Sequence, residues 1–526
     1  MSFGIFRAPL LKIYIYVGVF IMCLGIACLY GLPALIDQYI YSQIQLTPSS
    51  QSYKLWKELP LPIYQKFYFY NVTNGHDIEH LGRTPVLKEI GPFTYSSRWS
   101  KRKIVSYDNN QTISFKEYKV WQFERDLSVA DHKMIIHTLN TPLAITLTLI
   151  QNASNAVRII VTLSLDGLSE GFFVKRSAKQ LLFDGYPDLL TTFGPLLNVD
   201  MLTQGGKFGY MNARNNSEDG SYEINTGQDD ISKLGLIHRF NGRTELPYWN
   251  SKECNSFDGA TNGEVFPPIE DNQDSIRLFQ PDFCRVWRLD YNQTHKHPSG
   301  LVVKRFLANS EILRNSSDFA PNICYYSKKS TDPPPARPVN IRHEWPSGVF
   351  TLAPCRFNAP VFMSMPHFLD ADPYYLKTVD GLSPSRSKHE FYMDVEPTTG
   401  TPINLAARVQ LNVAINKPSG LVRFRNMPEI IFPIFWQELS VNLTEDIYDR
   451  LLMAANKPDE VTSYMCDKSA LFKSELSIAK SEPPPVTSIS IKHPKEMESL
   501  PPEPEMPPEP EVPPELKSGH SNDLHD

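Results

Sequence analysis

The feature that most constrains the chain is an uncharged stretch near its N-terminus, Ile13 to Ile36. As an α-helix at ~1.5 Å per residue, this stretch would rise ~36 Å, enough to cross a hydrocarbon core of ~30 Å. The alternative is a cleaved signal peptide, but the apolar region of a signal peptide usually has about 7–15 residues and ends in small side chains. We therefore predict a membrane-spanning helix over residues 10–36.

The charges around this stretch predict its orientation. Arg7 and Lys12 precede it, and Asp37 is the first charged residue after it. Because basic residues are enriched on the cytosolic side of membrane spans, residues 1–9 are predicted to be a short cytosolic N-terminus and the rest to be exported. Seven Asn-X-Ser/Thr triplets agree with an exported, glycosylated surface. Their asparagines are Asn71, Asn110, Asn152, Asn215, Asn292, Asn315 and Asn442.

Cysteine usage also fits an exported chain. Cys254, Cys284, Cys324 and Cys355 lie within one window of about a hundred residues, without the Cys-X-X-Cys spacing that is typical of zinc sites. In an exported protein, four cysteines form two disulfides, and three pairings are possible. Two further cysteines, Cys23 and Cys28, lie inside the predicted span. We interpret them as small apolar residues, with palmitoylation as the alternative. The last cysteine, Cys466, lies near the C-terminus.

Strand patterns dominate the region from residue 37 to residue 465. Runs such as "TISFKEYKVWQF", in which Ile113, Phe115, Tyr118 and Val120 alternate imperfectly with polar residues, are bounded by Pro, Gly and Asn. Helical spacing is concentrated in Asp131–Asn152 and Val174–Leu190. We predict a mostly antiparallel β domain with a helical insertion. The formal net charge of −6 offers no strongly basic face, which excludes a nucleic-acid partner.

One local motif suggests catalysis. Gly167-Leu-Ser-Glu-Gly171 matches the G-x-S-x-G nucleophile elbow, which requires a strand before it and a helix after it. The motif fixes only three positions, and the chain lacks the alternating strands and helices of an α/β hydrolase. We interpret it as a turn; the alternative is an exported or membrane-anchored serine esterase that uses Ser169. His295 and His297 have no matching ligands nearby, so we interpret them as solvated loop residues and predict neither a metal nor a cofactor.

The composition changes near the C-terminus. Leu500, Met506 and Val512 each precede a Pro-Pro-Glu triplet, which makes a six-residue repeat. Such Pro/Glu-rich sequence cannot form a packed core and favours extended polyproline II. We predict a disordered tail over residues 466–526.

An ordered set of motifs is similar to the class B scavenger receptor family. This family includes fatty acid translocase, croquemort, the lysosomal integral membrane proteins and the sensory neuron membrane proteins. The resemblance covers residues 10–445. The motifs are "FYFYNVTN", "LKEIGPFTY", "LLFDGYPD", "PYWNSKECNSFDGATNGEVFPP", "PDFCRVWRL", the long run that begins "APVFMSMPHFLDADPYYLK", and "IFPIFWQE".

The resemblance implies an antiparallel β-barrel-like ectodomain over residues 37–465, with an apical helical bundle and an apolar tunnel that leads towards the membrane. It implies a scavenger-type receptor that binds lipids at its apex and passes them through the tunnel without enzymatic activity. The implied ligands are fatty acids, sterols, carotenoids or apolar signals, and lipoprotein or cell-derived particles. The implied location is the plasma membrane, with an endosomal or lysosomal membrane as the alternative.

The resemblance also assigns residues. It pairs Cys254 with Cys324 and Cys284 with Cys355, and it implies that the third disulfide of the family is absent. It places one helix at the apex, where cations would attract anionic ligands; the alternative is an ordinary solvated helix face. The cations expected on that helix are Lys175, Arg176 and Lys179.

The predicted topology differs from that of the family. Family members return to the membrane by a second helix after the segment matching "IFPIFWQE", but here no apolar run near 18 residues follows it. We predict one anchor, so a tag placed after Asp526 should bind antibody on intact cells without permeabilisation. Staining of surface-exposed protein only after permeabilisation would reveal a second crossing.

Overall fold

The computed structural model describes residues 7–60, 63–152, 154–166, 171–188, 206–326, 345–416 and 424–455. The predicted tail over residues 466–526, Cys466 and Ser169 lie outside these ranges, as do residues 189–190 of the second predicted helical segment. Contacts between Cα atoms divide the chain into Met1–Ser463 and Tyr464–Asp526. All of the described structure belongs to the first unit.

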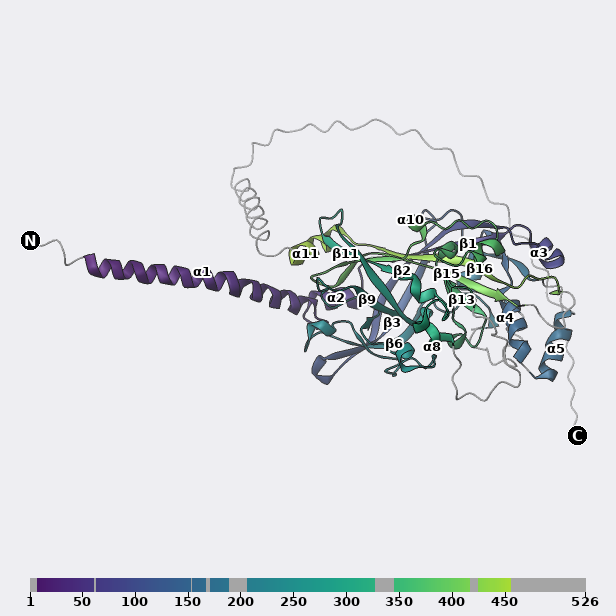
Figure 1. The fold of residues 1–526 in the computed structure, drawn as a ribbon, viewed down its shortest axis with the longest axis horizontal. Helices are drawn as coiled ribbons and strands as arrows, with labels where there is room; N and C mark the ends of the chain where they lie inside the picture. Colours follow the sequence, from purple (N-terminus) through teal and green to yellow (C-terminus); the bar gives the residue numbers. More distant parts are fainter. Residues whose placement is uncertain are drawn as a thin grey trace, which may run out of the picture. The chain divides into compact units, whose positions relative to one another are not determined.

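A long helix, α1, runs from Arg7 to Ile44 and includes residues 10–36 (Figure 1). Large apolar side chains of this helix are exposed, among them Ile13 at 56% and Phe20 at 67%. Within the described ranges, no helix combines the length and the hydropathy required of a candidate membrane span. The crossing of a membrane by α1 therefore stays a prediction.

The main structure is a fourteen-stranded sheet that is nearly closed. Its strands follow the order β7-β6-β3-β2-β1-β16-β15-β14-β11-β10-β9-β8, with β12 and β13 attached through β15. All described pairs are antiparallel except β8 with β9. An isolated bridge between Leu236, which precedes β7, and Thr261 of β8 links the two edges. The fold class predicted from sequence, mainly β with helical insertions, is confirmed.

The strands of this sheet have the following bounds: β1 Ile63–Val72, β2 Leu87–Tyr107, β3 Thr112–Phe123, β6 Ser217–Asn225, β7 Ile237–Phe240, β8 Ala260–Thr261, β9 Ser275–Gln280, β10 Arg285–Lys296, β11 Val302–Ala308, β12 Val349–Thr351, β13 Val361–Ser364, β14 Tyr392–Glu396, β15 Thr401–Ile415 and β16 Ile430–Asn442.

Two apolar clusters occupy different parts of the sheet interior. The first, called here the α4 cluster, joins Phe67, Phe93 and Trp121 to α4, which runs from Thr141 to Leu149. The second, called here the α2 cluster, packs the end of α1 and Trp56 of α2 (Gln51–Lys57) against strands β3, β6 and β9. Its members include Ile44, Ile113, Phe115, Tyr222 and Phe279. Figure 1 shows α2 and α4 at opposite ends of the sheet.

The helical insertion differs from the prediction. Ile135–Leu139 forms β4 and Phe173–Ser177 forms β5, and these two strands pair with each other. Both segments were predicted to be helical. In β4, Ile136 and Thr138 are buried while Ile135 is exposed, which is the two-residue period of a strand. The apolar content of the segment also fits helical spacing, so periodicity alone did not separate the two structures.

Helices do occur between these two strands. Asn140 caps α4 by accepting a hydrogen bond from the backbone of Leu143, and Pro142 occupies the first turn, where it is well tolerated. A second helix, α5, runs from Asn155 to Asp166. After β5, Gln180–Asp184 forms one turn of π-helix. The described part of the insertion therefore contains two α-helices, a turn of π-helix and a small two-stranded sheet.

Two disulfides lie later in the chain than α4 and α5. Cys254 is bonded to Cys324, and Cys284 to Cys355, over separations of 70 and 71 residues. This pairing is the one that the resemblance implies. Cys254 precedes β8 and Cys284 precedes β10, whereas Cys324 lies before residues 327–344 and Cys355 lies after them. The two bridges therefore connect parts of the chain that are distant in sequence.

Candidate functional site

The basic residues predicted for the apical helix lie instead on and beside β5. Lys175 and Arg176 are consecutive residues of this strand, so their side chains point to opposite faces. Lys175 is exposed, whereas the Arg176 guanidinium lies 4.8 Å from the ring centre of Tyr186. Lys179 follows the strand and pairs with Asp184 at 3.0 Å. The structure therefore does not gather the three cations on one helix face.

An exposed apolar stripe lies on α5. Ile159, Ile160 and Leu163 are 58%, 51% and 67% exposed, whereas Val161 is buried. Leu163 follows Ile159 by four residues and Ile160 by three, about one helical turn, so the three side chains share one face of the helix. Exposed apolar patches of this kind are typical of interaction sites for proteins or membranes.

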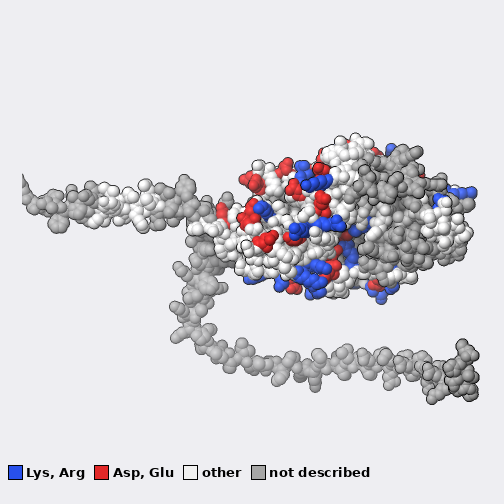
Figure 2. All heavy atoms as spheres, turned by 90° about the horizontal axis from the view of Figure 1, so that it is seen from below, with Lys and Arg blue, Asp and Glu red and all other residues white. Residues whose placement is uncertain are grey.

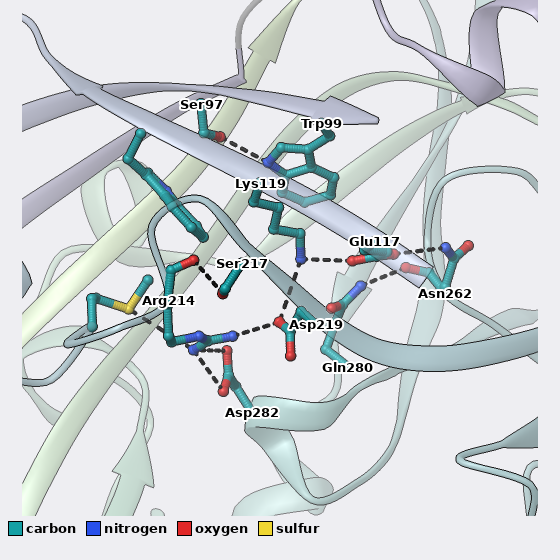
Figure 3. A network of polar contacts seen from close by, with 12 residues as sticks. Ser97, Trp99, Glu117, Lys119, Arg214, Ser217, Asp219, Asn262, Gln280 and Asp282 are labelled. Atoms are coloured by element: carbon teal, nitrogen blue, oxygen red, sulfur yellow. Dashed lines mark hydrogen bonds and ion pairs between the residues drawn. The ribbon is translucent and has the colours of Figure 1, made fainter. Parts of the chain in front are cut away.

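A network of paired charges runs from the interior of the sheet towards its surface, and Figure 3 shows the part of it from Glu117 to Asp282. The side chains of Lys101, Glu117 and Lys119 are buried, whereas those of Arg214, Asp219, Arg356 and Asp282 are 28%, 32%, 35% and 44% exposed. We call it the charged layer and define it by four cations and four carboxylates, which makes it formally neutral. Its members are Lys101, Lys119, Arg214, Arg356, Glu117, Asp219, Glu264 and Asp282.

The pairs of the charged layer form a chain of contacts. Lys119 Nζ lies 2.7 Å from Glu117 and 3.9 Å from Asp219. Arg214 contacts Asp219 at 2.7 Å and Asp282 at 2.9 Å. Arg356 contacts the same Asp282 at 2.9 Å. At the other end, Lys101 lies 2.5 Å from Glu264 and 3.6 Å from Glu117. These pairs connect β2, β3 and β6 to segments of the chain beyond residue 260.

The charged layer separates the two apolar clusters. Along the inward face of β3, Ile113 and Phe115 belong to the α2 cluster, then Glu117 and Lys119 enter the layer, and Trp121 belongs to the α4 cluster. All five side chains are buried at a spacing of two residues. Along β3, the inward face is therefore apolar, then charged, then apolar.

Pairing favours the charged forms of Glu117, Lys119 and Asp282. Burial by itself raises the pKa of Glu117, but Lys119 and Lys101 outweigh it and hold that pKa down at about 2. Burial lowers the pKa of Lys119, yet Glu117 and Asp219 raise it above its usual value. Asp282 also has a lowered pKa, because Arg214 and Arg356 outweigh its burial. Glu264 differs, because burial dominates and raises its pKa.

Of the two histidines considered as half of a metal site, His297 lies in the loop after β10, as predicted, whereas His295 lies on the strand. His295 lies on β10, with Nε2 3.8 Å from the buried carboxylate of Asp394. The His297 ring stacks on Tyr448, and its Nδ1 lies 2.9 Å from the Ser299 hydroxyl. Within the described ranges, no group of three or more His, Cys, Asp or Glu side chains is placed to hold a metal ion.

The neighbours of the nucleophile-elbow motif do not fit that motif. Ser169 itself lies outside the described residues, but the helix α5 ends at Asp166 before the motif and the strand β5 begins at Phe173 after it. A nucleophile elbow has the reverse order, strand then helix. The described flanks therefore give no support to a serine nucleophile.

The predicted glycosylation acceptors differ in exposure. Asn110 and Asn292 are exposed. The amide of Asn215 accepts a hydrogen bond from the Trp121 backbone at 2.9 Å and donates one back at 3.2 Å. Asn71 accepts from the His137 backbone at 2.9 Å, and Asn315 accepts from that of Asp318 at 2.9 Å. The side chains of Asn152 and Asn442 lie outside the described set. We expect the exposed acceptors to be the most readily modified.

The outer surface contrasts with the interior. Figure 2 shows basic and acidic side chains interspersed on one face of the molecule, without a single large patch of either sign. This mixture agrees with the small formal net charge of −6.

Sequence reasoning missed the charged layer, although part of its signal was present. In "TISFKEYKVWQF" the inward residues are Ile113, Phe115, Glu117, Lys119 and Trp121, whereas Tyr118 and Val120, expected on the apolar face, are only half-buried. The strict spacing of two from Ile113 to Trp121 includes both charges. Lys119 also pairs with Asp219, and the layer is completed by Glu264 and Asp282. These three carboxylates lie about a hundred residues or more further along the chain, and no local pattern identifies them.

Comparison with known proteins adds independent evidence. The model of the CD36 family matches residues 16–472. Lysosome membrane protein 2 of Homo sapiens is 32% identical over 423 residues, which cover 80% of this chain and 83% of that protein. Scavenger receptor class B member 1 is 31% identical in Cricetulus griseus over 424 residues and 30% identical in Bos taurus over 425 residues. Each of these two matches covers 81% of this chain and 79% of the relative.

The buried ion pairs should contribute more to the free energy of unfolding than similar ion pairs that face solvent. Replacing Glu117 with Ala leaves Lys119 and Lys101 in the interior without this partner, and the loss of one member of a buried pair usually costs about 3–5 kcal/mol. We expect a loss of this size in the free energy of unfolding, measured by chemical denaturation of the purified protein.

The matched control is Glu218→Ala. Glu218 also pairs with two lysines, Lys103 at 2.7 Å and Lys116 at 3.2 Å, but these lysines are 63% and 39% exposed. Exposed pairs usually contribute about 0–1 kcal/mol, so this variant should unfold almost like the parent. Equal losses in the two variants would contradict the interior role of Glu117.

Proposed function

Because the chain belongs to the CD36 family, we propose that it is a membrane-anchored scavenger-type receptor that binds lipids or lipidic particles and passes apolar ligand through its interior towards the membrane. The observation that carries this proposal is the family match over residues 16–472. The nearly closed sheet supports it, because such a sheet encloses an interior large enough to hold two apolar clusters.

The capture of ligand is proposed to occur at the end of the sheet that carries α4 and α5. The exposed stripe of Ile159, Ile160 and Leu163 offers apolar area to a lipid surface. Each CH₂ group of a lipid that leaves water there gains about 0.8 kcal/mol. Exposed Lys175 on the neighbouring strand β5 adds a positive charge that attracts anionic headgroups.

The anchor is proposed to be α1. Large apolar side chains exposed along it, such as Ile13, Val17 and Phe20, are stable in hydrocarbon and costly in water. We propose a single crossing with a cytosolic N-terminus, in the plasma membrane or in an endosomal or lysosomal membrane. A relative named lysosome membrane protein 2 supports the second location.

The charged residues near the proposed capture site provide the test. Reversing Lys175, Arg176 and Lys179 to Glu should reduce cellular uptake of a fluorescent anionic lipid by at least about threefold, because the local potential changes sign. Uptake of a neutral sterol analogue should be unchanged. The amounts of each variant at the cell surface must be matched, since Arg176 also packs against Tyr186.

The control is Lys88→Glu, which reverses an exposed cation on β2 outside the helical insertion. This variant should take up both lipids like the parent. If the triple variant and the parent take up the anionic lipid equally, capture through these cations is wrong.

A further inference from the structure

We propose that His76 and His80 form a binding site for a divalent transition metal such as Zn²⁺ on the outer face of the short helix α3, which runs from Gly75 to Leu81. His80 follows His76 by four residues, so the two side chains share one face of the helix. Imidazole is a preferred ligand of Zn²⁺ and similar metals, whereas Ca²⁺ and Mg²⁺ prefer oxygen. Metal binding here goes beyond the proposed lipid-receptor function and is independent of it.

The two imidazole rings lie together on the surface. Their centres are 4.3 Å apart and their planes differ by 17°, so the rings are stacked. Both histidines are exposed, and the side chain of His76 is 79% exposed. A metal ion can therefore reach both rings from solvent. Because the side chains are exposed, each ring can rotate to direct one nitrogen at a common ion.

The polar contacts of the rings indicate which nitrogens are available to a metal. His80 Nδ1 lies 3.0 Å from the backbone carbonyl oxygen of His76. A carbonyl oxygen only accepts hydrogen bonds, so in the neutral ring Nδ1 carries the proton and Nε2 keeps its lone pair. His76 Nδ1 lies 3.6 Å from the Asp77 carboxylate, which favours the same tautomer. Metal-binding histidines usually have this arrangement, with the second ring nitrogen facing a carbonyl or a carboxylate.

The backbone of α3 is held on its inner face and at its C-terminal end. Ile78 and Glu79 are buried, and Glu79 Oε2 accepts a hydrogen bond from the Phe172 backbone at 3.3 Å. At the end of the helix, the Asn426 side-chain amide donates to the His80 carbonyl oxygen. The backbone that carries the two imidazoles is therefore preorganised, which lowers the entropic cost of binding a shared ion.

The proposed metal site lies at the end of the sheet that carries α4 and α5 (Figure 1). A Cβ atom added at Gly75 would lie 2.9 Å from a ring atom of His137 on β4 and 3.2 Å from one of Phe173 on β5, so α3 packs closely against these strands. Protein-bound Zn²⁺ usually has four ligands. Two histidines therefore leave positions for water or for donor groups of a molecule that docks at this end.

Zn²⁺ itself is the probe, and its binding is measured by isothermal titration calorimetry of the full-length protein in lipid nanodiscs, purified without a histidine tag. His76→Gln and His80→Gln each remove one imidazole and keep a side chain that helices tolerate. Each variant should bind Zn²⁺ at least about tenfold more weakly than the parent, because two ligands on one helix act together. Ca²⁺ should not bind at this site.

The matched control is His238→Gln, which removes a histidine of β7 whose side chain is 44% exposed. This variant should bind Zn²⁺ like the parent. If the variant that lacks both His76 and His80 binds Zn²⁺ as tightly as the parent, or if His238→Gln weakens binding as much as His80→Gln, the proposed site is wrong.

Hydrogen exchange of the α3 backbone provides a second measurement. An ion that joins His76 to His80 stabilises the folded turn between them, so saturating Zn²⁺ should slow exchange in residues 75–81 by at least about tenfold. The variant that lacks both histidines should show no such change. Unchanged exchange of α3 in the Zn²⁺-loaded parent would contradict the proposal. Neither measurement uses a lipid ligand, so failure of the receptor function would leave both results interpretable.

Discussion

The pairing of β1 with β16 is the interaction on which the rest of the sheet depends. It joins residues far apart in the chain, with Ile63 opposite Val441 and Phe69 opposite Phe435. Lys66 contacts Glu438 at 2.7 Å across a sequence separation of 372 residues. Strands β2, β3, β6 and β7 extend the sheet beyond β1, and β15 and β14 begin its extension beyond β16. Without the pairing of β1 with β16, the strands on the β1 side and those on the β16 side would not enclose one interior. Forming a contact between residues so far apart in the chain costs conformational entropy.

A closed interior explains how charges can be buried inside it. Taking single ions out of water costs several kcal/mol each, and only close, well-oriented partners offset that cost. Strands β2 and β3 supply Lys101, Glu117 and Lys119, and the carboxylates that complete the layer come from later parts of the chain. The charged layer therefore exists only when the sheet has closed.

The sequence predicted the features that leave a local or ordered signal. The strand β3 was predicted, although its inward face continues through Glu117 and Lys119 and not through Tyr118 and Val120. The order of motifs identified the family and implied the pairing of Cys254 with Cys324. Ile135–Leu139 was assigned to a helix because its apolar residues satisfy both periods, and only its pairing with β5 decides for a strand. The charged layer was missed because charges are expected to face water. Here charged side chains face the interior, because the tertiary fold brings partners of opposite charge next to them.

The central claim is that the interior of this sheet holds lipid. The most direct measurement is mass spectrometry of the lipids that remain bound to the purified full-length protein. We predict that the parent protein retains long-chain lipid at about one molecule per chain. A parent protein that retains no more lipid than an unrelated membrane protein purified in the same way would contradict the claim.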